Sequence, residues 1–244
     1  MILFISDLHL SPRSPGATAL FLRFLAGRAR QAEALYILGD LFEVWVGDDI
    51  DDAYHTAIIS ALRAASDAGL KIHLMHGNRD FALGERFAAA AGARLLPDPF
   101  DLVLPECSFV LSHGDALCLD DPDYTAYRAK VRNPAWLQKM LSRPRFFRRQ
   151  LGRYIRWRSR RRKRDLNLVY TDLQPAATDD FIRDHGYATF IHGHTHRAAT
   201  HDHMVDGIHV ERWVLADWHE DRGECLVWDG EALKREALIP ENRP

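Results

Sequence analysis

The sequence has few cysteines and no long hydrophobic run, and these absences exclude several classes of protein. Cys107, Cys118 and Cys225 are odd in number, far apart and outside any metal-binding spacing, which argues against a disulfide framework and a structural zinc site. No apolar stretch approaches the roughly 18 residues of a membrane-spanning helix. The run from Met1 to Ile5 is short and lacks the basic start of a signal peptide, so we expect a protein of the cytoplasm.

What the chain does have is the composition of a folded protein. Hydrophobic residues make up 47% of it and charged residues 27%, and the mean hydropathy is -0.28. This balance argues against both a disordered chain and an integral membrane protein. Its 244 residues are enough to bury a large core, and we expect one domain over 1–244.

The basic side chains are concentrated in one segment. The formal net charge is -2, but residues 143–164 hold 11 Arg, one Lys and no acidic residue. Four apolar residues of this segment fall at helical spacing: Phe147, Leu151, Tyr154 and Ile155. The pattern predicts a basic amphipathic helix with three possible uses. The helix would lie on anionic lipid, or bind the phosphates of a nucleic acid with its aromatic rings stacked on bases, or pack its apolar face on the rest of the protein.

Five short polar clusters carry the residue types of metal ligands. They are Asp7-Leu8-His9, Gly39-Asp40, Gly77-Asn78-Arg79-Asp80, Ser112-His113-Gly114-Asp115 and His192-Gly193-His194-Thr195-His196. Each follows a short apolar run that predicts a strand, over 2–6, 34–38, 71–75, 109–111 and 188–191. Because open α/β sheets bind ligands just beyond the carboxyl ends of strands, we expect all five clusters on one rim.

The last cluster is the strongest single signal, since three imidazoles at alternate positions are a poor way to build a turn or a core. Imidazoles and carboxylates together suit Mn, Fe or Zn better than Ca or Mg. Two such ions about 3.5–4 Å apart bind phosphoryl oxygens and generate hydroxide at neutral pH. The ordered clusters therefore predict a two-metal phosphoesterase centre, and we expect Mn²⁺ to occupy it.

The remaining patterns alternate between helix and strand. Periodicity and helix formers predict helices over 16–29, 52–68, 84–91, 135–141 and 175–185. Strand-like runs follow at 207–215, 223–228 and 232–238, the last two joined by the hairpin sequence Asp229-Gly230. These elements predict an α/β protein with two sheets.

The clusters resemble the calcineurin-like metallophosphoesterase superfamily, whose motifs are D-x-H, GD, GNH(D/E), a later H and GHxH. The resemblance implies an α/β/β/α sandwich of two mixed sheets and two divalent metal ions. One ion would be held by Asp7, His9, Asp40 and His196. The other would be held by Asp40, Asn78, His113 and His194, with Asp40 as the bridge.

Arg79 departs from the superfamily pattern, because many members carry a His there that protonates the departing oxygen. A guanidinium stays charged and cannot act as that acid. An alcohol leaving group needs the proton, whereas a phosphate released from an anhydride, with a second pKa of about 6, does not. Arg79 therefore favours a pyrophosphate substrate, and the alternative is a surface Arg that pairs with Asp80.

Longer stretches narrow the resemblance to the UDP-2,3-diacylglucosamine hydrolase family of lipid A biosynthesis. They are residues 7–10, 36–43, 76–81, 113–121 and 191–197. This family implies hydrolysis of the pyrophosphate of UDP-2,3-diacylglucosamine to UMP and 2,3-diacylglucosamine 1-phosphate, by metal-activated hydroxide at the α-phosphorus. It also implies a helical lid insertion at about 119–171 and peripheral association with the cytoplasmic face of the inner membrane.

Site residues carry over by position. The resemblance implies Asp40, Arg79 and His113 as catalytic residues. The implied substrate contacts are Asn78, Arg79, Asp121, Arg156, Ser159, Lys163 and His194. Beyond Ser159 the match weakens, since Lys163 stands where relatives carry Asn and Leu166 where a substrate-binding Lys is expected.

Two other functions stay open at this point. A metallonuclease or general nucleotide phosphodiesterase would use the same ions and place the basic helix on nucleic acid. A non-catalytic module that binds nucleic acid or a membrane would need only the basic helix. The family resemblance instead predicts the lipid substrate and the inner-leaflet membrane surface as partners, with no nucleic acid and no obligate protein partner.

Overall fold

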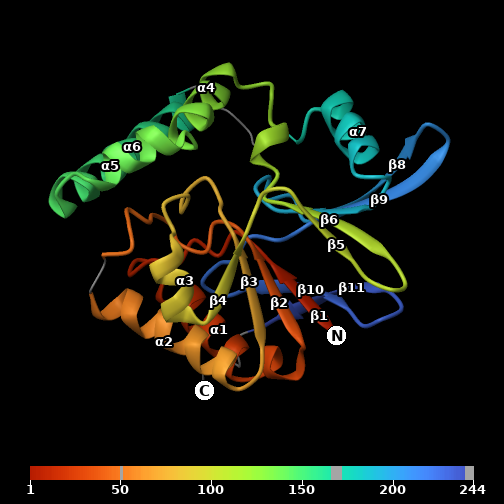
Figure 1. Cartoon of the computed structure of the whole chain (residues 1–244), viewed down its shortest axis with the longest axis horizontal. Helices are drawn as coiled ribbons and strands as arrows, with labels where there is room; N and C mark the ends of the chain where they lie inside the picture. Colours follow the sequence, from red (N-terminus) through yellow and green to blue (C-terminus); the bar gives the residue numbers. More distant parts are fainter. Residues whose placement is uncertain (50–51, 166–171, 240–244) are drawn as a thin grey trace.

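The computed structural model describes residues 1–49, 52–165 and 172–239. Two mixed β-sheets pack on each other, and helices lie on both outer sides (Figure 1). Each sheet contains parallel and antiparallel strand pairs. The predicted α/β/β/α sandwich is therefore confirmed.

The first sheet has the strand order β11-β10-β1-β2-β3-β4. Its strands are β1 (Ile2–Ile5), β2 (Ala34–Leu38), β3 (Lys71–Met75), β4 (Ala93–Leu96), β10 (Gly223–Trp228) and β11 (Leu233–Leu238). Strands β1 to β4 are parallel, so a crossover connects each to the next. The helices of this half are α1 (Pro15–Ala26), η1 (Arg28–Gln31), α2 (Ala53–Asp67) and α3 (Glu85–Ala91). Because β1 and β2 are buried on both faces, their sequences are continuous apolar runs rather than alternating ones.

The second sheet has the order β5-β6-β7-β9-β8. Its strands are β5 (Phe100–Val103), β6 (Ser108–Ser112), β7 (Thr189–His192), β8 (Ala199–Val205) and β9 (Ile208–Val214). Helix α7 (Pro175–Asp184) covers its outer face, where Ile182 packs with Phe190 and Val210.

Aromatic side chains join the two sheets. The ring of Phe4 stacks on Tyr36 at a centroid distance of 5.4 Å and meets the edge of Phe109 at 5.9 Å. Phe109 in turn meets the edge of Trp228 at 5.3 Å. Each such buried ring contributes roughly 1.5–3 kcal/mol, so this cluster fixes how the carboxyl ends of β1, β2 and β6 face one another.

Three helices are inserted between the short helix η2 (Asp115–Leu117) and α7. They are α4 (Pro122–Val131), α5 (Pro134–Leu141) and α6 (Arg145–Asp165), drawn in green at one end of the molecule in Figure 1. The insertion begins and ends at one point, because Gln174 N donates to Leu117 O at 3.0 Å. Among the residues described, no helix is long and apolar enough to cross a bilayer.

The predicted helix is present as α6, and the four apolar residues at helical spacing differ in their exposure. Leu151 and Ile155 are half-buried, whereas Phe147 is 51% and Tyr154 55% exposed. The physical reason is that α6 packs on the loop after β2 through arginines rather than aromatics. Arg148 is only 5% exposed, and its Nη1 donates to Asp49 Oδ1 at 2.8 Å.

Candidate metal centre

The five predicted clusters converge, and they come from both sheets. Asp7 and His9 follow β1, Asp40 follows β2, and Asn78 follows β3, while the second sheet supplies the rest. Those are His113 after β6 and His194 and His196 after β7. Each cluster stands at the carboxyl end of its strand, as expected for an α/β ligand site.

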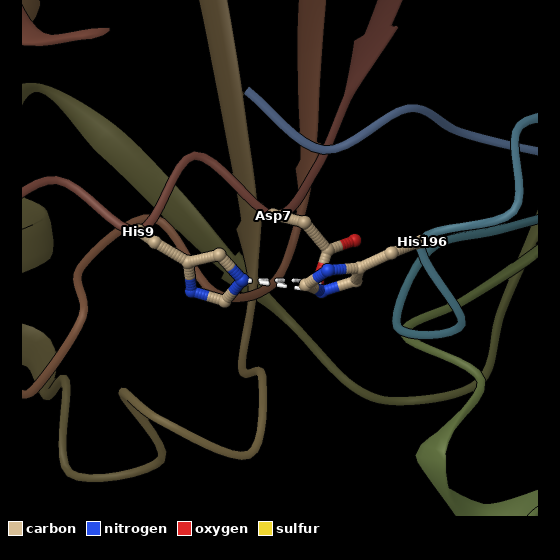
Figure 2. Close-up of side chains that lie close together, drawn as sticks. All are labelled: Asp7, His9 and His196. Atoms are coloured by element: carbon tan, nitrogen blue, oxygen red, sulfur yellow. Dashed lines mark hydrogen bonds and ion pairs between the residues drawn. The ribbon is translucent and has the colours of Figure 1, made fainter. Parts of the chain in front are cut away.

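Asp7, His9 and His196 form one set of potential ligands, and their side chains point toward one another (Figure 2). Asp7 Oδ1 lies 3.3 Å from His196 Nε2 and 3.8 Å from His9 Nε2. The two ring nitrogens are 3.2 Å apart. Asp7 Oδ1 is buried and accepts no hydrogen bond from the residues described. Three donor atoms directed at one point, one of them an orphaned carboxylate oxygen, fit a divalent cation.

Asp7, Asp40 and His113 form the second set, and all three are buried. His113 Nδ1 donates to Leu38 O at 2.9 Å, which directs Nε2 into the centre. That nitrogen lies 3.2 Å from Asn78 Oδ1 and 3.9 Å from Asp40 Oδ1. His194 lies next to it, with ring centroids 5.0 Å apart.

Two carboxylates touch both halves of the centre. The two sets share Asp7. Asp40 contacts both as well, because its Oδ2 lies 3.8 Å from His9 Nδ1 and its Oδ1 lies near His113. The residues therefore fit two neighbouring cations bridged by a carboxylate, the role for which the resemblance implies Asp40.

Burial and neighbouring charge determine the protonation of these groups. Burial raises the pKa of Asp40 to about 7. Burial acts in the same direction on Asp7, but pairing with His196 and the charge of His113 hold its pKa well below the ordinary value. Burial lowers the pKa of His194 to about 3, and burial with the charge of Arg79 lowers that of His9. Two imidazoles are thus held in the neutral form, which is the form that binds metals.

The backbone of the centre is strained. Five of the seven predicted ligands have positive φ, with 54° at Asp7, 48° at His9, 52° at Asp40, 68° at His194 and 53° at His196. Left-handed backbone is uncommon for residues other than glycine, and it gathers at functional sites. Nearby glycines are required for a separate reason, close approach: a Cβ at Gly77 would lie 2.1 Å from Asp40 Oδ1.

Three supporting residues were not assigned roles from the sequence. The buried carboxylate of Asp80 accepts from Gly77 N at 2.8 Å and from Asp40 N at 3.3 Å, so it joins two ligand loops. Asp217 Oδ2 lies 3.2 Å from His196 Nδ1 and orients that ring. His192 faces away from the centre, where its Nε2 lies 3.1 Å from Nη1 of Arg212. The third imidazole of the His-rich cluster is therefore part of the support.

Comparison with known proteins places this geometry in a family. Residues 1–198 match the Calcineurin-like phosphoesterase family. A UDP-2,3-diacylglucosamine hydrolase of Aromatoleum aromaticum is 47% identical over 228 residues, which are 93% of each chain. One of Pseudomonas paraeruginosa is 48% identical over 98% of this chain and 99% of its own. The chain belongs to the UDP-2,3-diacylglucosamine hydrolase family.

Membership confirms the family predicted from the motifs and makes the chain a hydrolase. A third relative from this family, of Klebsiella pneumoniae, is 45% identical over 90% of this chain and 91% of its own. The phosphoesterase family implies divalent metal ions, in agreement with the two sets of potential ligands.

Arg79 lies at the edge of the centre and is 11% exposed. Its Nε lies 3.4 Å from Asp40 Oδ2, and its Nη1 donates to Glu43 Oε2 at 3.1 Å. Asp80 instead binds backbone N–H groups, so the expected alternative, a surface ion pair between Arg79 and Asp80, does not describe this position.

The other expected substrate contacts fall on the inserted helices. Asp121 caps α4 by accepting from Tyr124 N at 3.0 Å. Tyr124 stacks on His194 at a centroid distance of 5.7 Å, so α4 begins directly over a potential ligand. Arg156 of α6 pairs with Glu43. Ser159 and Lys163 also belong to α6, but their side chains lie outside the described part of the molecule, as does Leu166.

Proposed function

We propose that this chain hydrolyses the pyrophosphate bond of UDP-2,3-diacylglucosamine to UMP and 2,3-diacylglucosamine 1-phosphate, with Mn²⁺ as its cation. The observation that carries the proposal is the position of Arg79, next to the bridging candidate Asp40 and shielded from solvent. A guanidinium there stabilises negative charge that develops on phosphate oxygens. It supplies no proton, and a departing sugar phosphate needs none.

The seven ligand residues would hold two cations. We assign Asp7, His9, Asp40 and His196 to one, and Asp40, Asn78, His113 and His194 to the other, with Asp40 between them. When bound, such ions neutralise phosphoryl oxygens and lower the pKa of a water molecule toward neutrality. The chain's own part is to hold the diphosphate so that water attacks the α-phosphorus in line with the departing oxygen.

Substrate binding would combine the centre with the insertion. Arg79 Nε and Arg156 Nε are both buried, and neither has a hydrogen-bond partner in the described parts of the chain. Donors in that condition suit an anionic ligand. We assign the diphosphate to these two guanidiniums and to Asn78 and His194. Asp121, Ser159 and Lys163 complete the proposed contacts on the insertion.

The insertion would act as a lid, and its outer surface would meet the membrane. We propose that residues 119–171 cover the centre and that α6 rests on the inner leaflet of the inner membrane. Phe146 is 74%, Phe147 51%, Tyr154 55% and Trp157 54% exposed. Arginines flank the rings, with the Arg161 guanidinium 5.5 Å from the Trp157 ring centroid. Exposed rings among cationic groups are typical of a helix at an anionic lipid surface.

Phosphorus NMR in oxygen-18 water tests the reaction. The protein with Mn²⁺ is expected to cleave UDP-2,3-diacylglucosamine and place the label in UMP, whereas Asp40→Asn is expected to lose this activity. Label in the lipid product would contradict attack at the α-phosphorus. Absence of cleavage, or faster turnover of bis(p-nitrophenyl) phosphate than of the UDP-lipid, would favour a general phosphodiesterase.

A further inference from the structure

Glu43 is a carboxylate between the metal centre and α6. It follows β2 in the loop that carries Asp40, and its side chain is 20% exposed. Its Oε2 lies 3.1 Å from Arg79 Nη1 and 3.7 Å from His9 Nδ1. Its Oε1 pairs with Nη2 of Arg156, on the inserted helix. One carboxylate therefore contacts side chains from three separate segments of the chain.

The two guanidiniums would repel each other without an anion between them. Their side chains are 11% and 17% exposed, so solvent and salt screen that repulsion less than at an open surface. Glu43 offsets one of the two positive charges and leaves one. That remaining charge is of the sign that a diphosphate requires.

Glu43 also leaves suitable donors open. A guanidinium has five N–H groups in a fixed plane. Glu43 engages one terminal nitrogen of each arginine, while neither buried Nε–H group donates a hydrogen bond to the described residues, although Arg79 Nε faces Asp40 Oδ2 at 3.4 Å. The carboxylate thus holds Arg79 and Arg156 by one edge and leaves another edge of each available to a second anion.

We propose that Glu43 is a positioning residue that sets Arg79 and Arg156 at the spacing at which both donate to one diphosphate. Because both arginines bind this carboxylate, closure of α6 over the centre also orients Arg79. The inference rests on the proposed function, because it takes a diphosphate as the anion. It assigns Glu43 no contact with the reacting atoms.

The chain offers a matched control in Asp49. Asp49 also ties α6 to the loop after β2, through Arg148, at 2.8 Å between Arg148 Nη1 and Asp49 Oδ1. None of the contacts that the structure gives Asp49 is with a predicted metal ligand. A role limited to anchoring the helix predicts the same effect for Glu43→Gln and Asp49→Asn. A role in positioning Arg79 predicts different effects.

Steady-state kinetics with UDP-2,3-diacylglucosamine and Mn²⁺ separate these cases. Glu43→Gln is expected to lower kcat/KM by on the order of tenfold to hundredfold, with a lower kcat and a higher KM. Asp49→Asn is expected to leave kcat within about twofold of wild type. In the double variant Glu43→Gln/Arg156→Gln, the loss should be smaller than the product of the single losses. Equal effects of Glu43→Gln and Asp49→Asn, a lower KM in Glu43→Gln, or multiplicative losses would overturn the proposal.

Hydrogen exchange of the α6 amides tests the same coupling without turnover of the lipid. Inorganic pyrophosphate added to the Mn²⁺-loaded protein is expected to slow exchange in α6 in wild type and in Asp49→Asn, but not in Glu43→Gln. Equal protection in all three, or none in wild type, would contradict a positioning role. If wild type leaves the UDP-lipid intact but shows this pattern, the proposed function fails while the role of Glu43 stands.

Discussion

Individual residues of the centre adopt backbone conformations that their side chains disfavour. The left-handed φ of Asp7, His9, Asp40, His194 and His196 turns each ligand inward just after a strand ends. Such a residue costs roughly 1–2 kcal/mol relative to glycine in the same conformation. Other interactions of the fold must offset this free-energy cost. The strained conformations bring the ligand side chains together as a potential cation site.

This strain gives a test at His196. In metal-free protein, His196→Gly is expected to be more stable than His196→Ala by about 1 kcal/mol, because glycine adopts positive φ without strain. Urea unfolding of the two variants measures the difference.

His113 provides the control, since it is not among the residues with positive φ. There the order should reverse, with His113→Ala more stable than His113→Gly. The same order at both positions would argue against strain as the cause.

The sequence allowed the types of the site residues to be predicted, but not the contacts that those residues make. Asp7, His9 and His196 could be named because their spacing matches a motif, and the structure brings them together. Glu43 ends one of the matching stretches and Asp217 lies outside them, but neither was given a role, because their roles depend on which loops the fold places beside them. His192 stands in the most informative motif yet faces Arg212, because a strand alternates its side chains between two faces.

Among the elements, α6 shows that periodicity predicts a helix but does not predict what its apolar residues contact. Its arginines bind carboxylates of the loop after β2, and its aromatic rings remain outside. Helix α4 escaped prediction because its apolar residues follow no helical period, although Asp121 and Pro122 form a good start. The edge strand β8 was missed because four of its residues in a row, from Thr200 to His203, are polar and leave no apolar alternation to read.

The exposed rings of α6 give a test of membrane association. Phe146→Ser/Phe147→Ser is expected to bind anionic phospholipid vesicles about tenfold more weakly, since partial burial of two rings contributes more than 1.4 kcal/mol. Vesicle flotation measures the bound fraction. Met204→Ser is the control, because Met204 is also exposed, at 68%, but lies on β8. Equal binding by all three proteins would exclude these rings from the interface.

Asp172, which precedes α7, is joined to the second sheet by an ion pair. Arg212 of β9 donates from Nη1 and Nη2 to the two carboxylate oxygens of Asp172, each at 2.8 Å. Arg212 is buried, and its hydrogen bonds hold the pKa of Asp172 well below its ordinary value. The pair connects the residues just before α7 to Arg212, which also contacts His192.

Asp172→Asn is expected to lower the free energy of unfolding at pH 7 by roughly 1–3 kcal/mol. Because the pKa of Asp172 is depressed in the folded state, its stabilisation is full above the ordinary pKa of about 3.9 and is lost as the pH falls toward the folded-state value. Urea unfolding between pH 7 and pH 3 should therefore show a constant difference that shrinks below about pH 4. Asp206→Asn, at an exposed pair with Arg183, should cost less. A difference independent of pH would point to lost packing instead.

In the whole molecule, the two sheets meet at the metal centre. The first sheet supplies Asp7, His9, Asp40 and Asn78, and the second supplies His113, His194 and His196. The packing of two sheets face to face followed from the family resemblance, but the strand order was not predicted, since no periodicity states which strands become neighbours. Cations that bind only the folded arrangement stabilise it by mass action.

Chelation tests this dependence. Mn²⁺ at a hundred times its dissociation constant is expected to add about 2.7 kcal/mol to the free energy of unfolding, and a chelator should remove it. Calorimetry with and without chelator measures the shift in Tm. His113→Ala should show a smaller metal-dependent shift, and an equal shift would mean that the ion binds elsewhere.

The hydrogen bond from Gln174 N to Leu117 O joins the two ends of the inserted helices. Because the chain leaves the sandwich and returns to it at neighbouring residues, this connection does not restrict the length of the inserted segment. A different insertion between these two residues is therefore expected to leave the strand order intact. The contacts of Arg148 with Asp49 and of Arg156 with Glu43 nevertheless tie the insertion to the loop after β2, so exchanging the insertion would also change how that loop is held.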